Sequence, residues 1–207
     1  MTDKFAEDTY LTLSKASDEA IYKGKGSKFL AFAYPIGQVE EVEVLIQKLK
    51  RKHPKARHWC YAWQMGIEKP SFRYNDDGEP NNSAGKPIYG QILSFSLTNV
   101  LIVVVRYFGG TKLGVGGLIV AYRSAARLAL EGSKIVEKMI MEDFTIRFDY
   151  VHMDKVMRIV KENDLIILNQ TMELDCLFKI SVRRMKLKQV VNLIQGLRCD
   201  IEVKNLN

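Results

Sequence analysis

Cysteine is scarce in this sequence, and no hydrophobic run is long. The three cysteines, Cys60, Cys176 and Cys199, are an odd number at wide spacings, which argues against a disulfide framework and against a zinc site of paired thiols. The longest apolar stretch, Val100–Val105, is far shorter than the ~20 residues of a membrane span, and Met1–Leu13 lacks the basic and apolar regions of a signal peptide. We therefore expect a cytoplasmic protein without a membrane-spanning segment.

Proline is also rare, and neither charge sign dominates strongly. With five prolines, 47% hydrophobic and 27% charged residues, the composition is that of a packed globular protein and not of a disordered one. A length of 207 residues fits two modest domains. The formal net charge is +7, and most of the basic excess lies in residues 1–132. Such a charge favours polyanionic partners such as RNA, but it also occurs in proteins that bind none.

The first part of the sequence alternates strand and helix patterns. Asn99–Tyr107 is a nearly continuous apolar run, typical of a central strand that is buried on both faces. Strands are also predicted at Lys28–Ile36 and Arg57–Gly66. Apolar residues at helical spacing predict one helix over Val39–Leu49, ending before Pro54, and another from Leu118 to Gly132.

The second part follows a simple rhythm of six elements. We place the domain boundary at Gly132–Lys134, giving domains 1–132 and 133–207. The order strand, helix, strand, strand, helix, strand is that of a ferredoxin-like plait, so the chain as a whole is predicted to be an α+β protein. The predicted elements are Met141–Asp149, Met153–Glu162, Ile166–Met172, Leu177–Arg184, Leu187–Leu197 and Asp200–Val203.

Glycines concentrate between the central strand and the helix that follows it. Five of the nine residues in Gly109–Gly117 are glycine, and glycine lets backbone amides approach another group closely. Together with a helix N-terminus and nearby cations, these amides would form an anion site. The alternative is a tight turn with close helix-to-strand packing. The candidate anion-binding residues are Arg106, Tyr107, Gly109, Gly110, Lys112, Gly114, Gly116, Gly117, Lys86 and Arg123.

Neither nucleotide-binding pattern fits this junction. The lysine is misplaced for GxxxxGK[ST], and the glycine spacing is not GxGxxG. Nucleotide hydrolysis and dinucleotide binding are therefore disfavoured, and no cofactor is expected.

A second unusual segment, Arg73–Pro87, crowds three acids around an Asp-Gly turn. Asp76, Asp77 and Glu79 could hold Mg²⁺ or act as acid and base, which makes them the alternative catalytic candidates. The composition is also that of an ordinary surface loop. If the loop folds beside Lys112, its acids would instead orient the basic groups.

The strand at Arg57–Gly66 carries two further patterns. His58 and Cys60 lie two residues apart and therefore face the same way, which would allow a thiol–imidazole pair or a purely structural arrangement. Trp59, Tyr61 and Trp63 share the other face, as core rings or as a base-stacking platform. No group of histidine and cysteine ligands indicates zinc, and outside the alternative role of the acidic loop no metal site is expected. The basic run from Lys48 to Arg57 is either a solvated face or a nucleic-acid patch.

Five segments keep the order and spacing of a known family. They are KGSKF at Lys25–Phe29, Ala56 with His58 and Cys60, DDGEP at Asp76–Pro80, AGKP at Ala84–Pro87 and VVRYFGGTKLGVGGLIVAY at Val104–Tyr122. Together they resemble the IMPACT/YigZ family over nearly the whole first domain, and the tail is similar to the smaller C-terminal domain of bacterial members. The sequence departs at Asn81–Ser83, where the family usually has a small residue, glycine and threonine.

The resemblance implies a fold and a context. It implies, for the first domain, the α/β fold shared with a domain of ribosomal proteins and translation factors, and for the second a plait like the last domain of elongation factor G. It also implies a role in translation, because eukaryotic relatives resemble regulators of the kinase that slows translation initiation under amino-acid starvation. Besides the junction glycines, Arg106, Tyr107 and Lys112, the family's marked residues fall on Asp76, Asp77, Gly78, Glu79, Ala84, Gly85 and Pro87.

Three functions follow from these patterns. The leading hypothesis is a translation regulator that binds RNA or the ribosome through the glycine-rich anion site. The alternative is a metal-dependent hydrolase or phosphotransferase that uses the acidic loop. A further alternative is a protein-binding module without catalysis.

Overall fold

In the computed structural model, which describes residues 8–197 and 200–203, the chain divides between Lys138 and Met139. The first unit is Tyr10–Lys138. The second contains the described residues from Met139 onward together with Asp8 and Thr9. The boundary at Gly132–Lys134 stays a sequence prediction. Of the helices that the structure describes, none combines the length and the apolar character that a membrane crossing requires.

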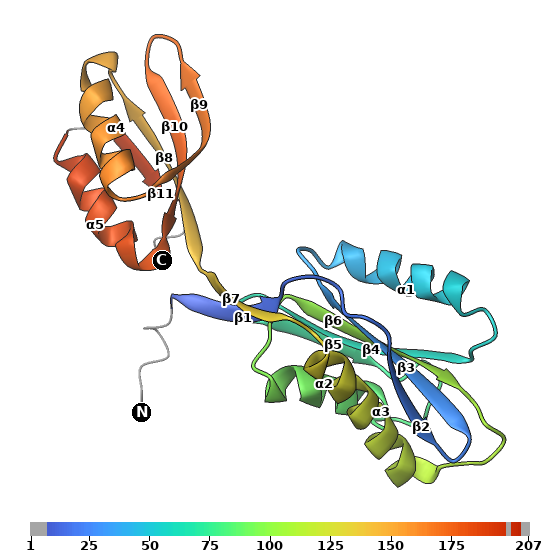
Figure 1. Cartoon of the computed structure of the whole chain (residues 1–207). Coiled ribbons are helices and arrows are strands. Elements are labelled where there is room, and N and C mark those ends of the chain that lie inside the picture. The colour runs from blue at the N-terminus through green and yellow to red at the C-terminus, as the bar shows by residue number, and fades with distance from the viewer. Residues whose placement is uncertain (1–7, 198–199, 204–207) are drawn as a thin grey trace. The chain divides into compact units, whose positions relative to one another are not determined.

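An antiparallel sheet of five strands forms the centre of the first unit, in the order β2-β3-β6-β4-β5. The run Val100–Val105 lies in β6, the middle strand, which confirms the predicted central position. Helix α1 covers one face, and α2 and α3 cover the other (Figure 1). The strands are β2 Ala20–Gly24, β3 Ser27–Pro35, β4 His58–Met65, β5 Ser71–Asn75 and β6 Val100–Tyr107.

Strand alternation decides which side chains reach which face of this sheet. In β6, Ile102 and Val104 pack in the core beneath α2 and α3, whereas Val103 and Val105 pack beneath α1. Side chains alternate between faces along a strand. Arg106 therefore points to the side of α2 and α3, and Tyr107 points to the side of α1.

Two of the three helices were predicted, and α2 was not. α1, Glu40–Lys52, has acids in its first turn and bases in its last, both of which suit the helix dipole. α2 is Gly85–Ser94, and α3 is Gly114–Glu131, which ends just before Gly132 as predicted. Two further strands, β1 Thr9–Leu13 and β7 Ile135–Met139, pair in a separate two-stranded sheet.

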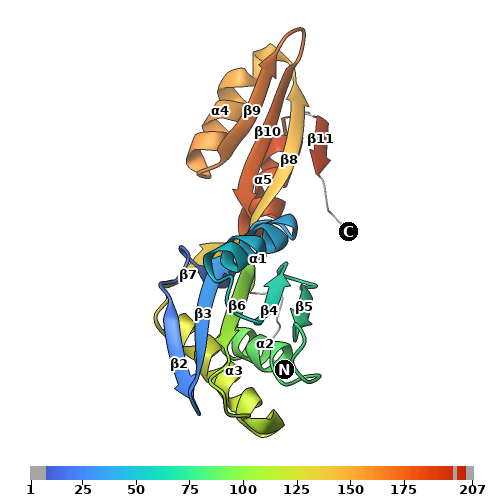
Figure 2. The same cartoon turned by 90° about the vertical axis from the view of Figure 1, so that its right-hand side faces the viewer.

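The second unit is the predicted ferredoxin-like plait. Its described strands form an antiparallel sheet in the order β11-β8-β10-β9, with α4 and α5 packed on one face (Figure 2). The order along the chain is β8, α4, β9, β10, α5, β11, which confirms the predicted α+β pattern. The bounds are β8 Met141–Phe148, α4 Met153–Glu162, β9 Ile166–Met172, β10 Cys176–Arg183, α5 Arg184–Gln195 and β11 Asp200–Val203, with a 3-10 turn, η2, at Tyr150–His152.

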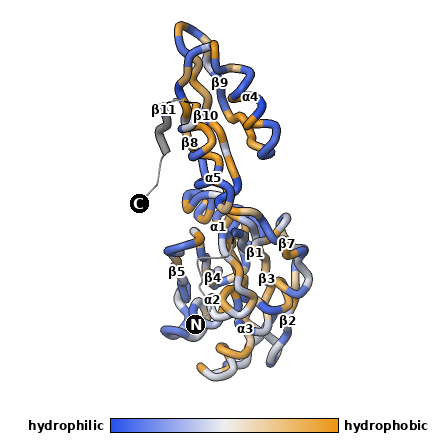
Figure 3. Tube along the Cα trace, turned by 90° about the vertical axis from the view of Figure 1, so that its left-hand side faces the viewer, coloured by the Kyte–Doolittle hydropathy of each residue, from blue (hydrophilic) through white to orange (hydrophobic). Residues whose placement is uncertain are grey.

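Each unit has its own hydrophobic core. In the second unit, Phe144, Ile146 and Phe178 of the sheet are buried against Val156 of α4 and Val190 of α5. In the first unit the sheet has a core on both faces. The hydropathy colouring of Figure 3 shows hydrophobic residues along strands of the four-stranded and the five-stranded sheet. The chemically unusual segments identified in the sequence all lie in the first unit.

A candidate anion-binding cavity

The acidic loop and the glycine-rich junction meet in one cavity of about 460 Å³. The loop contributes Glu79 and Pro80, and the junction contributes Lys112 and Gly114. Arg106, at the end of β6, also lines it. Segments more than thirty residues apart in the sequence thus line a single cleft, with the acidic loop beside Lys112. His58, the first residue of β4, and Arg57, which precedes it, complete the polar lining.

Arg106 is the most unusual residue of this cavity, because its charge is almost wholly buried. Only 7% of its side chain is exposed, and its Nη1 lies 2.6 Å from Oε1 of Glu79. The guanidinium carbon lies 5.5 Å from the ring centroids of both Phe29 and Phe108, within the range of cation–π contacts. Its Nε is buried without a hydrogen-bond partner among the described residues. Arg106 therefore keeps unused donor capacity beside the cavity.

Glu79 is the acceptor around which the buried polar groups gather. Besides Arg106, the hydroxyl of Tyr122 donates to Oε1 of Glu79 over 2.8 Å, and Nε2 of His58 lies 3.9 Å from the same oxygen. The carboxylate is 4% exposed. The lining therefore holds three permanent cations, Arg57, Arg106 and Lys112, and one carboxylate. A net positive lining of this kind suits an anion.

The other two acids of the loop, Asp76 and Asp77, accept hydrogen bonds from backbone amides. The carboxylate of Asp76 accepts the amides of Asn82, Ala84 and Gly85 at 2.8–2.9 Å, and so caps the start of α2. Oδ2 of Asp77 accepts the amide of Trp59 over 2.7 Å. Among the described residues, no three His, Cys, Asp or Glu side chains are grouped so that they could hold a metal ion. These contacts favour a positioning role for the loop acids.

The loop turns sharply in order to bring Glu79 inward. Asp77 and Gly78 both have positive φ, 40° and 84°, and the amide of Glu79 donates to the carbonyl of Asp76 over 2.9 Å. Nδ1 of His58 donates to the carbonyl of Asp77 over 2.8 Å, which ties the turn to β4. The Asp-Gly signal in the sequence is thus the turn that delivers the carboxylate to Arg106.

The junction glycines serve different purposes. A Cβ on Gly109 would lie 1.9 Å from the carbonyl carbon of Gly26, so that glycine is required for close packing against β3. Gly110 and Gly114 have positive φ, 88° and 74°. A Cβ on Gly116 would meet nothing within 4 Å, and its φ is not positive. The packing interpretation therefore applies at Gly109, and the anion-binding interpretation stays a prediction, for which Gly116 leaves open space.

No side chain of Leu113 or of the first turn of α3 caps the amides at the start of this helix. The N-cap residue Leu113 makes no side-chain capping bond, and no acid occurs in the first turn. Helix N-termini in this condition attract anions, because the free amides and the helix dipole both favour negative charge. Gly114 and Val115, the first residues of the helix, line the cavity.

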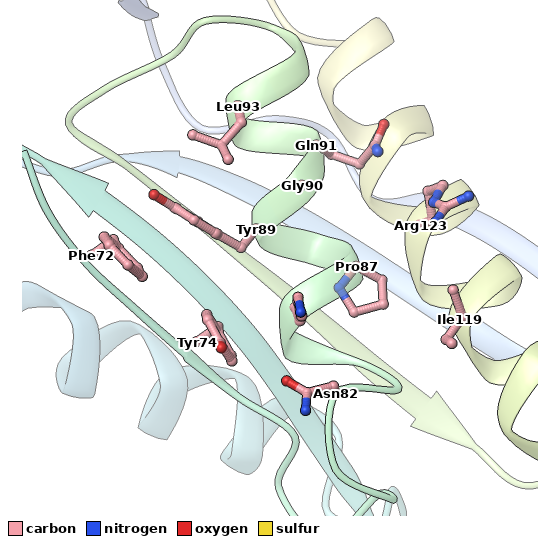
Figure 4. Close-up of a pocket in the computed structure, with 11 residues that line it drawn as sticks. Phe72, Tyr74, Asn82, Pro87, Tyr89, Gly90, Gln91, Leu93, Ile119 and Arg123 are labelled. Carbon is pink, nitrogen blue, oxygen red and sulfur yellow. The ribbon is translucent and has the colours of Figure 1, made fainter.

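Of the ten candidate anion-binding residues, three line this cavity: Arg106, Lys112 and Gly114. The other four junction glycines, Gly109, Gly110, Gly116 and Gly117, do not line it, and the remaining three candidates lie elsewhere. Tyr107 is on the face covered by α1, where its hydroxyl lies 3.1 Å from Nδ1 of His53. Lys86 and Arg123 line a separate cavity of about 680 Å³ (Figure 4). Arg57, at the end of the basic run, also lines the anion cavity, and no pattern in the sequence distinguished it from the other basic residues of that run.

The rings of β4 and the pair His58 and Cys60 have structural surroundings. Trp63 is buried, and Trp59 and Tyr61 are partly buried, in the core beneath α1. The thiol of Cys60 contacts the carbonyl of Asp76 at 3.1 Å and the hydroxyl of Tyr122 at 3.3 Å, and does not pair with His58. Burial raises the pKa of Cys60 well above its usual range, so the thiol stays protonated.

Alkylation tests this buried thiol. At pH 8, we expect iodoacetamide to modify Cys60 at least about 100-fold more slowly in the folded protein than in urea, because only an exposed thiolate reacts. Peptide mass spectrometry identifies the modified cysteine, and the urea-unfolded chain is the control. Rapid modification of Cys60 in the folded protein would restore the thiol–imidazole hypothesis.

Known proteins match both units. The sequence model of the Impact N-terminal domain matches residues 25–130. The IMPACT family member YvyE of Bacillus subtilis is 33% identical over 77% of this chain and 73% of its own, and YigZ of Escherichia coli is 29% identical over 80% and 82%. A crystal structure described as that of an hypothetical protein covers 97% of this chain and 100% of that one, with a TM-score of 0.76 and 25% identity. The resemblance seen in the sequence is confirmed, and the chain belongs to the IMPACT family.

Proposed function

We propose that this protein binds RNA, free or within the ribosome, through the cavity between the acidic loop and the glycine-rich junction. The observation that carries the proposal is Arg106, which lines the cavity, is nearly buried and has an Nε without a hydrogen-bond partner in the described part of the chain. A buried positive charge is stabilised by a negative charge nearby. In the lining of the cavity, Glu79 is the one residue that provides such a charge. An incoming phosphate would supply more, because arginine presents five donors in a planar fork.

The remaining lining suits a phosphate backbone. Lys112 and Arg57 add exposed positive charge, and the first turn of α3 adds backbone amides. The cavity is open on the surface of a chain whose formal net charge is +7. Membership of the IMPACT family supports a translation-associated role. We therefore place the RNA ligand in that context.

Two other functions explain less of the geometry. A hydrolase or phosphotransferase would need the loop carboxylates to face a substrate, whereas Asp76 and Asp77 accept backbone amides. A protein-binding module would not require a buried, partly unpaired guanidinium in the lining. Titration with RNA separates both alternatives from the proposal.

Lys112→Glu tests the site directly. We expect this change to weaken RNA binding about tenfold at low salt, because it removes one phosphate contact and adds a repulsive charge. The slope of log affinity against log salt concentration should fall by about 1 for the lost contact. Fluorescence anisotropy of a labelled single-stranded RNA, measured at several salt concentrations, gives both quantities.

The matched control is Lys15→Glu, which makes the same charge change on an exposed lysine that does not line the cavity. It should lower affinity only slightly. Equal, salt-insensitive binding by the wild type and Lys112→Glu would end the proposal. Equal losses in the two variants would show an effect of net charge with no specific site.

A further inference from the structure

Three aromatic rings gather on the surface of the first unit beside its edge strand. Phe72 and Tyr74 alternate on β5, so both rings project from one face of the sheet, and Tyr89 of α2 faces them (Figure 4). The centroids of Phe72 and Tyr89 are 4.5 Å apart with ring planes at 14°, and Tyr74 lies 6.1 Å from Tyr89 at 28°. We call these three nearly parallel rings the aromatic platform.

The platform is exposed, and hydrogen bonds hold Tyr89, the ring on which the other two stack. Phe72 is 53% exposed and Tyr74 is 36% exposed. The hydroxyl of Tyr89 donates to Oε1 of Gln64 over 2.9 Å, and Nε2 of Gln64 in turn donates to the carbonyl of Leu97 over 3.0 Å. Clustered exposed rings mark binding surfaces, and rings already fixed in position lose little freedom on binding.

Positive charge lines the cavity next to the platform. Lys86 and Arg123 both border this cavity of about 680 Å³, and no Asp or Glu does. Figure 4 shows Arg123 on α3, across α2 from the platform. The cavity thus offers flat apolar faces on one side and a guanidinium on the other. This combination suits a polyanion with planar groups.

Gly90, which also lines the cavity, is a glycine that the fold does not require. It lies inside α2, its φ is not positive, and a Cβ there would meet nothing within 4 Å. Glycine in a helix interior destabilises the helix relative to alanine. Without a side chain at Gly90, a ligand in this cavity has room to approach α2 closely.

The linings of the two cavities include residues that are close in the sequence. Pro80 and Leu118 line the anion cavity, while Asn82 and Ile119, their near or immediate neighbours in the chain, line the cavity beside the platform.

We propose that the aromatic platform stacks the bases of single-stranded RNA while Lys86 and Arg123 hold its phosphates. This inference rests on the proposed function and adds that the ligand is unpaired. Bases inside a duplex already stack on each other, whereas the bases of a single strand are free to stack on aromatic rings. A peptide added to the edge strand β5 is the competing occupant, but the acid-free basic lining favours RNA.

The test uses two probes of equal length, a labelled oligouridylate and an abasic phosphodiester oligomer. The double variant Phe72→Ala with Tyr74→Ala should weaken oligouridylate binding about tenfold or more in anisotropy titrations, because it removes stacking. Its affinity for the abasic oligomer should stay within about twofold of the wild type. Gly90→Leu, which fills the cavity, should also weaken oligouridylate binding. Val44→Ala, which truncates an exposed apolar residue on α1, is the matched control.

The outcomes separate this inference from the proposed function. If the platform variants bind oligouridylate like the wild type while Lys112→Glu binds it weakly, the platform does not stack bases and the anion cavity stands. Equal losses for both probes would also overturn base stacking. If the wild type binds neither probe, the proposed function fails and takes this inference with it. Unchanged tryptophan fluorescence, from Trp59 and Trp63 of β4, shows that each variant is folded.

Discussion

Replacing Glu79 with alanine is expected to destabilise the first unit by about 3–5 kcal/mol, the cost of leaving one partner of a buried ion pair uncompensated. The side chains of Glu79 and Arg106 are only 4% and 7% exposed, and their charged atoms are 2.6 Å apart. The same change also removes the acceptor of the Tyr122 hydroxyl. Burial makes the loss large, because water cannot replace the missing carboxylate.

Urea unfolding followed by tryptophan fluorescence measures this loss. Both tryptophans, Trp59 and Trp63, lie in β4, so the signal reports the first unit and not the second. The matched control is Glu131→Ala, which breaks the exposed pair with Arg127 on α3, where the charged atoms are 2.7 Å apart and the side chains are 64% and 44% exposed. The control should cost less than about 1 kcal/mol. Equal losses in the two variants would contradict the role of burial.

Glu79→Gln tests how the pair of Glu79 and Arg106 affects RNA binding. The amide keeps the size of the side chain and one acceptor oxygen, so we expect a smaller loss of stability than with alanine. The charge of Arg106 is then no longer neutralised beside the cavity, and RNA binding at low salt should become tighter. A lower stability with a higher affinity is the result expected of a ligand site. If affinity falls although the protein stays folded, Glu79 contacts the ligand in some other way.

Regular elements were predicted from the sequence where one periodicity dominates. In the second unit, α4 and β11 begin and end at the predicted residues. The apolar run of β6 identified its central position. Each of these patterns is local, since the buried face of the element can be read from its own residues.

The elements that were not predicted contain residues that are also typical of loops. β5 is a short, exposed edge strand, SFRYN, and α2 begins Gly85-Lys86-Pro87, a composition typical of loops. Proline is tolerated in the first turn of a helix, where the amides lack intrahelical partners. The cap that starts α2 is the carboxylate of Asp76, nine residues before the amide of Gly85. Local patterns do not reveal a cap supplied from that distance.

The two segments of the site were predicted from the sequence, but their positions relative to each other were not. The acids and the glycines were identified as unusual, and the acids were expected to orient basic groups if the loop lay beside Lys112. The pairing of Glu79 with Arg106 spans 27 residues and depends on the order of strands in the sheet. The aromatic platform was not predicted because its rings come from β5 and α2, two elements that the sequence patterns did not indicate. The alternation of Phe72 and Tyr74 was the signal available for it.

Gly109→Ala should be the most damaging glycine substitution in the junction. An added Cβ would lie 1.9 Å from the carbonyl carbon and 2.2 Å from the oxygen of Gly26, and 2.3 Å from the amide nitrogen of Ser27. These are backbone atoms, so no change of rotamer relieves the overlap, and the loop must move away from β3. We expect a loss of about 3 kcal/mol or more in the urea unfolding of the first unit.

Gly116→Ala is the matched control, because it adds the same methyl group to the same junction in open space. A Cβ there meets nothing within 4 Å, and alanine favours the helix by up to about 1 kcal/mol, so stability should hold or rise. RNA affinity should nevertheless fall, since the methyl group keeps a phosphate from the amides of the first turn of α3. An unchanged affinity would restrict the ligand surface to the cavity side of the helix. Opposite effects of the two variants on stability would separate the glycine needed for packing from the glycine left open to a ligand.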